Sequence, residues 1–139
     1  MDYHNAFQIS ASGMALEKLR FDVSAANLAN MHTSAAPGTA LYRPQRVVSQ
    51  AMALDFSHQY RQAGGARAQA VDAGDAGGRL EYDPQHPHAN SAGFVAYPAV
   101  NHTAEMVNIN DALRAYEANV VAMNAARTMA ARALTIGDQ

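Results

Sequence analysis

The chain contains no cysteine, and only one of its ten basic residues is a lysine, Lys18. Without cysteine there can be no disulfide, no thiolate metal site and no cysteine nucleophile. The net charge is -2 and the pI is near 6.3, with the arginines thinly spread. Attraction to nucleic acid or to an anionic membrane requires clustered positive charge, so we expect no nucleic-acid partner.

Long apolar runs are also missing. No stretch approaches the roughly 20 consecutive apolar residues that span a bilayer, so we expect no transmembrane segment. Asp2, Asn5 and Gln8 interrupt the first ten residues, which lack the basic, apolar and small-residue regions of a secretory signal. We therefore expect any export to use a route that does not cleave a signal peptide.

Residues that break helices are rare at both ends of the chain. All five prolines and seven of the nine glycines lie between Pro37 and Pro98, which leaves only Gly13 and Gly137 in the flanks. This layout predicts a mainly α fold, in which long N- and C-terminal helices pair as a coiled coil around a small, irregular, β-containing insert. We expect an N-terminal helix, a central module and a C-terminal helix within residues 1–36, 37–102 and 103–139. Such a layout favours a building block over an enzyme.

The predicted N-terminal helix, from about Tyr3 to Asn30, carries apolar residues on two tracks that each repeat every seven residues. The first track is Ile9, Leu16 and Val23, with Leu19 and Ala26 beside it, and the second is Phe7, Met14, Phe21 and Leu28. Positions two residues apart lie about 200° round an α-helix, so the tracks face nearly opposite sides. A helix that is apolar on two sides needs more than one partner. The alternative is the central helix of a small bundle.

The predicted C-terminal helix begins between Thr103 and Asn110 and ends at Leu134, before Gly137. Its apolar residues step alternately by four and three, which is typical of a coiled-coil seam. This seam consists of Ile109, Leu113, Tyr116, Val120 and Met123, and its spacing continues through Arg127, Ala130 and Leu134 with one charged interruption. We expect it to pair with the N-terminal helix, leaving that helix's second track free to contact other copies in an open assembly. A discrete four-helix homodimer is the alternative.

The central insert contains four candidate strands separated by glycine-rich turns, at residues 46–48, 67–72, 79–82 and 94–97. Strands this short form only a small module with a poor core of its own. We expect the module to pack against the helices or against neighbouring subunits. Residues 63–78 are equally compatible with a flexible loop.

His86, His88 and Asp83 have the side chains of a metal site. However, the His86-Pro87-His88 segment predicts an extended pair whose side chains diverge, so we expect neither a metal nor a cofactor. We predict that Asp83-Pro84 opens a turn and that Pro87 holds the following loop extended. No arrangement of nucleophile and base suggests an enzyme.

Four segments are recognisable together. They are Ile9 to Met14, Ser24 to Asn30, Tyr82 to Pro87, and Arg114 to Asn119. In this order they resemble the bacterial flagellar rod and hook family, and within it the C-type proximal rod proteins. The B-type proximal rod proteins and, outside the family, a soluble coiled-coil adaptor are the alternatives.

The resemblance implies a structural subunit of the flagellar proximal rod, which polymerises through its terminal helices into the drive-shaft segment above the MS ring. The implied partners are copies of itself, other rod proteins, the MS ring, the export apparatus and the rod cap during assembly. The implied location is the periplasm-spanning rod of the basal body, reached by flagellar type III export without signal cleavage. The terminal helices would be loosely formed in the monomer and would pair on incorporation.

The resemblance also implies roles for individual residues. Asn27 and Asn30 would end the first helix by bonding free backbone groups. The expected assembly interface consists of Ile9, Met14, Leu16, Leu19, Phe21, Val23, Asn27, Leu28, Asn30, Ile109, Leu113, Tyr116, Val120 and Met123. The central motif of the family corresponds to Tyr82, Asp83, Pro84, His86 and Pro87.

Overall fold

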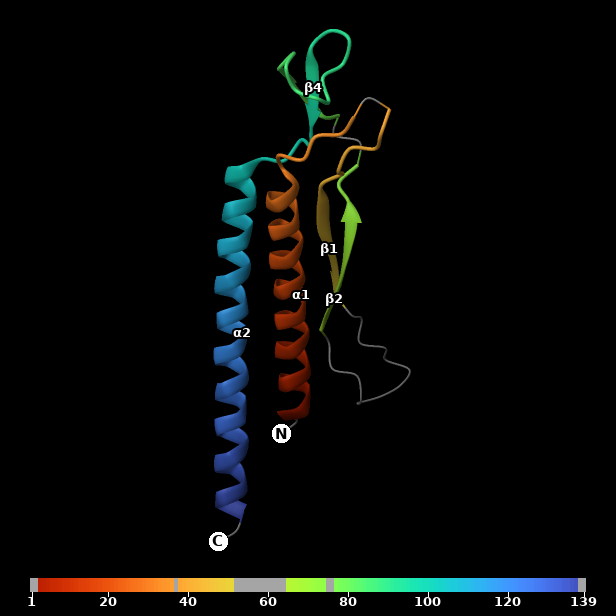
Figure 1. Cartoon of the computed structure of the whole chain (residues 1–139). Helices are drawn as coiled ribbons and strands as arrows, with labels where there is room; N and C mark the ends of the chain where they lie inside the picture. The colour runs from red at the N-terminus through yellow and green to blue at the C-terminus, as the bar shows by residue number, and fades with distance from the viewer. Residues whose placement is uncertain (1–2, 37, 52–64, 75–76, 138–139) are drawn as a thin grey trace, which may run out of the picture.

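The computed structural model describes residues 3–36, 38–51, 65–74 and 77–137. Its elements in chain order are α1 (Tyr3–Asn30), β1 (Gln45–Ala51), β2 (Ala66–Asp72), β3 (Arg79–Tyr82), β4 (Phe94–Tyr97) and α2 (His102–Gly137). The two helices lie side by side and run in opposite directions, and α2 extends beyond the N-terminal end of α1 (Figure 1). The terminal helices around a strand-containing insert are as predicted, and α1 has the predicted bounds.

The start of α2 is fixed by a side-chain cap that the sequence analysis missed. Asn101 Oδ1 accepts a hydrogen bond from Ala104 N at 3.1 Å, which satisfies a backbone N–H that has no partner within the helix. The helix therefore begins at His102, one residue before the predicted range. The predicted stop at Leu134 was wrong, because the helix continues to Gly137.

The four strands form two separate antiparallel hairpins. In one, β1 pairs with β2 from Gln45↔Asp72 to Ala51↔Ala66, and in the other β3 pairs with β4. The strand predictions are confirmed, and the loop alternative is wrong for Ala66–Asp72. The β1–β2 hairpin packs along α1, whereas the β3–β4 hairpin lies beyond the ends of the helices (Figure 1).

The buried core of the described residues is small. Its apolar members are Val23, Val95, Pro98, Ala112 and Ala126, and its polar members are Ser10, Glu17, Ser24 and Asn27. The buried positions on the helices are therefore mostly small or polar. Neither described helix has an apolar stretch long enough to cross a lipid bilayer.

Candidate assembly interface

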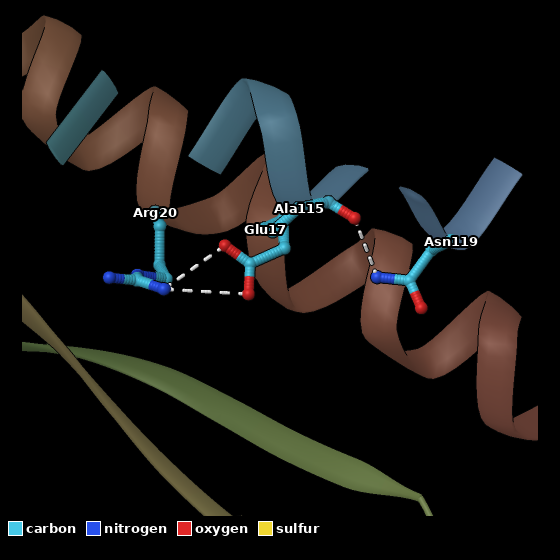
Figure 2. Close-up of polar contacts among 4 residues, drawn as sticks. All are labelled: Glu17, Arg20, Ala115 and Asn119. Carbon is cyan, nitrogen blue, oxygen red and sulfur yellow. Dashed lines mark hydrogen bonds and ion pairs between the residues drawn. The ribbon is translucent and has the colours of Figure 1, made fainter. Parts of the chain in front are cut away.

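The two helices approach each other closely at Gly13. A Cβ atom at this position would be 2.7 Å from Asn119 Oδ1 and 3.0 Å from the side-chain carbon and nitrogen behind it. The Asn119 side chain lies along its own helix, because Nδ2 donates a hydrogen bond to the Ala115 carbonyl oxygen at 2.9 Å (Figure 2). Glycine at position 13 therefore leaves the room that the Asn119 amide occupies.

A partly buried ion pair lies next to this contact. Glu17 is one helical turn from Gly13 and is 8% exposed. Arg20 Nη1 lies 3.1 Å and 3.4 Å from the two Glu17 carboxylate oxygens (Figure 2). The guanidinium offsets the cost of removing the carboxylate from water. We call Gly13, Glu17, Arg20 and Asn119 the middle polar layer.

A second polar group joins three parts of the chain at Asn27, whose exposure is 1%. Asn27 Nδ2 donates to the Gln45 carbonyl oxygen at 2.8 Å and to Glu105 Oε1 at 3.0 Å. Asn27 Oδ1 accepts from Gln45 N and from the Tyr42 hydroxyl, each at 2.9 Å. Both donors and both lone pairs of the amide are thus used. This Asn27 junction connects α1 to the start of β1 and to the first turn of α2.

Tyr42 serves the junction as a hydrogen-bond donor. Burial raises the pKa of the Tyr42 phenol above its usual value, and the negative charges of Glu105 and Asp72 raise this pKa further. The phenol therefore keeps its proton at neutral pH. The hydroxyl therefore remains available to donate its hydrogen bond to Asn27 Oδ1.

The predicted roles of the two asparagines have different outcomes. Asn30 Nδ2 donates to the Ala26 carbonyl oxygen at 2.8 Å, a bond to the backbone of the last turn of α1. The Asn30 carbonyl oxygen, at the end of α1, accepts hydrogen bonds from Thr33 N and Thr33 Oγ1. The prediction for Asn27 was wrong, because its amide bonds to β1, α2 and Tyr42 rather than to the end of its own helix.

The middle polar layer and the Asn27 junction together define the register of the helix pair. Gly13 lies opposite Asn119, and Asn27 bonds to Glu105, so the contacts are two heptads apart on each helix. Small or polar residues also recur every seven positions along both helices. They are Ser10, Glu17 and Ser24 on α1, and Glu105, Ala112, Asn119 and Ala126 on α2.

The apolar residues predicted for the interface on α1 have varied burial. Val23 is buried and Ile9 is 49% exposed. The other predicted residues are partly buried, namely Met14, Leu16, Leu19, Phe21 and Leu28. The β1–β2 hairpin supplies a second packing partner for this helix. One contact between them is the Ala66 N–H, which donates to Ser12 Oγ at 3.2 Å.

The predicted seam of α2 is not centred on the line that α1 covers. Leu113 is 44% exposed and Tyr116 is 39% exposed, whereas Ala112 and Ala126 are buried. Ile109, Val120 and Met123 are partly buried. The covered line is thus displaced toward alanines, because small side chains allow the closest approach to α1. The role of the seam in assembly stays a prediction.

The central motif folds as a turn after β3. Asp83 Oδ1 accepts from Gln85 N at 3.2 Å and the Asp83 carbonyl oxygen accepts from His86 N at 3.3 Å, which confirms the predicted turn. Tyr82, at the end of β3, packs edge to face against Phe94 of β4 with ring centroids 5.3 Å apart. The motif therefore closes the β3–β4 hairpin.

The predicted divergence of the two histidine side chains was wrong. The rings of His86 and His88 lie edge to face with centroids 5.3 Å apart, because Pro87 lies in a turn instead of an extended loop. His88 N donates to His86 Nδ1, and His88 Nδ1 lies 2.9 Å from Ser34 Oγ. Among the described residues, no group of three or more His, Asp or Glu side chains is placed to hold a metal ion.

Comparison with known proteins gives the family. The chain is 34% identical over 138 residues to the flagellar basal-body rod protein FlgC of Yersinia enterocolitica, covering 99% of this chain and 100% of that one. The chain belongs to the FlgC family of flagellar basal-body rod proteins. It is also 36% identical over 149 residues to FlgC of Bacillus subtilis, covering 99% of both chains. FlgC of Salmonella typhimurium is 35% identical over 134 residues, covering 96% of this chain and 97% of the relative.

A second comparison agrees. Residues 91–136 match the family described as flagellar basal body rod FlgEFG protein C-terminal, a range that contains β4 and nearly all of α2. The resemblance predicted from the four segments is confirmed. As a FlgC-family member, the chain is a structural subunit of the flagellar basal-body rod and not an enzyme.

Two features of this FlgC-family chain escaped the sequence analysis. The contact of Gly13 with Asn119 had one sequence signal, since Gly13 is the only glycine in a helix of 28 residues. The Asn27 junction had none, because Gln45 and Glu105 are 18 and 78 residues away in the sequence. Apolar periodicity finds large side chains and does not mark a buried amide.

Proposed function

We propose that this chain polymerises through its terminal helices into the proximal segment of the flagellar rod, above the MS ring. The observation that carries the proposal is the distribution of side chains around α2. Its buried positions are Ala112 and Ala126, whereas large apolar side chains remain at its surface. The exposed large apolar residues of α2 are Met106, Val107, Leu113, Tyr116, Val121, Met129 and Leu134.

The small core supports this proposal. Each large apolar side chain that leaves water contributes about 1.5–3 kcal/mol, whereas a buried alanine contributes much less. Val23, Val95 and Pro98 are the only buried apolar residues larger than alanine among those that the structure describes. We therefore expect a weakly stable isolated subunit, which gains burial when neighbouring helices cover its surface.

The two helices would thus have different inner and outer surfaces. Inside the subunit, the middle polar layer and the Asn27 junction set the register of α1 against α2. Outside, Leu113 and Tyr116 lie three residues apart on one face of α2 and provide an apolar stripe for a helix of a neighbour. In this arrangement the coiled-coil seam predicted for α2 is shared between α1 and the neighbouring subunit.

The expected partners follow from a position at the base of the rod. They are copies of this chain, other rod proteins, the MS ring, and the export apparatus and rod cap during assembly. We infer that the chain reaches this position by flagellar type III export without signal cleavage. We propose that the chain has two terminal helical parts, at residues 1–36 and 103–139, and a central module at residues 37–102. The two helical parts would form the rod core.

The test begins with basal bodies extracted in detergent from the source bacterium. Mass spectrometry of bodies from strains with and without the gene would show whether the chain is part of the rod. We expect the chain in intact bodies, loss of the rod in the deletion strain, and recovery when the gene is returned on a plasmid. Persistence of complete rods in the deletion strain would contradict the proposal and would favour a soluble adaptor.

A further inference from the structure

We propose that the C-terminal end of α2 from one copy seats on an exposed apolar face of the β3–β4 hairpin of a second copy. This inference rests on the proposed polymerisation and adds the two surfaces that meet along the rod. We call residues 129–135 the α2 tail. We call the face formed by Leu80, Tyr82, Phe94 and Ala96 the hairpin face.

The α2 tail has no helix beside it. Gly13 lies opposite Asn119 and Asn27 opposite Glu105, so the same register places Tyr3, the first described residue of α1, level with Met129. The remaining residues of α2 extend past α1 (Figure 1). Met129 is 55% exposed and Leu134 is 75% exposed. Most of the other tail residues are alanines, so Leu134 projects from a narrow helix that can approach another surface closely.

The hairpin face is a second apolar surface without a cover. The strand register places Leu80 opposite Ala96 and Tyr82 opposite Phe94 on one side of the hairpin. Leu80 is 64% exposed, Tyr82 is 66% exposed and Phe94 is 39% exposed, whereas Val95 on the other side is fully buried. Leu80 and Tyr82 are thus mostly exposed in the subunit.

The hairpin face is also hollowed. A concave site beside it is lined on its apolar side by Ala35, Ala36, Leu41, Leu80, Phe94 and Ala96. Segments from before β1 and from both strands meet there. Such a concave apolar surface can receive a projecting aliphatic side chain such as that of Leu134.

Charge favours a second copy as the occupant. Residues 127–139 carry two positive charges, Arg127 and Arg132, and one negative charge, Asp138, a net charge of +1 from the side chains. The β3–β4 segment from residue 79 to 97 carries two acidic residues and one arginine, a net charge of -1 with neutral histidines. That arginine, Arg79, is paired with Glu81 at 3.5 Å, which leaves the charge of Asp83 unopposed within the hairpin. The opposite charges favour a head-to-tail approach.

The two surfaces cannot meet within one chain. The α2 tail lies at one end of the molecule and the β3–β4 hairpin at the other, separated by the length of the helix pair (Figure 1). A contact between two different surfaces of identical copies is heterologous, so it continues as an open assembly unless it closes into a ring. This is the geometry that a rod requires.

Cysteine cross-linking tests the contact directly, because the chain contains no native cysteine. The test variant carries Leu134→Cys and Leu80→Cys. The matched control carries Val121→Cys and Leu80→Cys, since Val121 is another exposed apolar residue of α2, at 68%, but lies outside the tail. Basal bodies containing each variant are oxidised, and the cross-linked species are resolved by denaturing electrophoresis. A disulfide forms only between Cα atoms within about 7 Å.

We expect the test variant to form dimers and higher multimers, and the control variant and both single variants to remain monomeric. Normal incorporation of the test variant without cross-links, or equal cross-linking of the control, would overturn this inference and leave the proposed function intact. If the chain itself is absent from basal bodies, the proposed function fails first.

A charge-rescue pair covers the case in which a cysteine variant is not incorporated. Leu134→Glu is expected to reduce incorporation at least tenfold, and adding Leu80→Arg is expected to restore most of it. Normal incorporation of Leu134→Glu, or no rescue by the second substitution, would overturn the contact.

Discussion

The contact of Gly13 with Asn119 gives the sharpest test of the helix pair. The change Gly13→Ala places a Cβ atom 2.7 Å from Asn119 Oδ1, inside any normal contact distance. Relief requires either a shift of the helices or rotation of the Asn119 side chain away from the Ala115 carbonyl oxygen. Overpacking of this kind costs about 1–3 kcal/mol, and a lost hydrogen bond costs about 1 kcal/mol.

Helix propensity acts in the opposite direction. Alanine is favoured over glycine by about 1 kcal/mol in the interior of a helix. In the natural Asn119 background the cost of relief is set against this gain, so we expect Gly13→Ala to destabilise the chain by up to about 2 kcal/mol. In an Asn119→Ala background the obstruction is gone, and the same change is expected to stabilise by up to about 1 kcal/mol.

The assay is a double-mutant cycle, with the free energy of unfolding obtained from urea titrations followed by circular dichroism at 222 nm. The expected result is a reversal of sign between the two backgrounds, which isolates the pairwise term from helix propensity. Stabilisation by Gly13→Ala in both backgrounds would refute the close approach and, with it, the register of the helix pair.

Three further predictions concern the Asn27 junction and the outer surface of α2. Asn27→Ala leaves the Gln45 backbone groups unpaired, so we expect a loss of roughly 2–4 kcal/mol in urea unfolding; an effect below 0.5 kcal/mol would contradict the junction. Val120→Asp is expected to prevent incorporation into rods while leaving secretion intact; normal rods from Val120→Asp would remove Val120 from the interface. Because the folded pKa of Tyr42 is raised above 10.0, its contribution to stability is complete below that pH and is lost as the pH rises through the folded pKa. Tyr42→Phe should therefore show a shallower loss of stability above pH 10 than the natural chain, and identical slopes would contradict the shift.

The elements of the fold could be predicted because the residues that interrupt helices and strands are unevenly distributed. Every proline lies in the insert, so the bounds of α1 and all four strands could be placed from turn chemistry and periodicity. The Asp83-Pro84 turn was predictable for the same local reason. Its consequence, the approach of His86 to His88, depends on how the next residues fold back, which no dipeptide preference specifies.

The contact line between the helices could not be predicted from apolar spacing. The alternation of four and three residues identifies Leu113 and Tyr116, yet the residues buried beside α1 are Ala112 and Ala126. An apolar stripe shows which side chains avoid water in the working state of the protein. It does not say whether the cover comes from the same chain or from another. The family itself was recognisable from sequence because its four segments include both kinds of residue. Some, such as Asn27, are buried within the chain, and others, such as Tyr116, are exposed on its surface.

The composition of the helix pair links its register to its need for neighbours. Leucines packed between α1 and α2 would make a self-sufficient hairpin, because each contributes about 1.5–3 kcal/mol on burial. Glycine, alanine and hydrogen-bonded amides contribute little of this free energy. However, a misaligned pair would separate Asn27 from Glu105 and would move the Asn119 amide out of the space that Gly13 leaves, so these two contacts oppose other registers. The pair is thus well defined in alignment and weak in isolation. Its large apolar side chains stay outside, where a neighbouring subunit can bury them and where burial favours the assembled rod over the free chain.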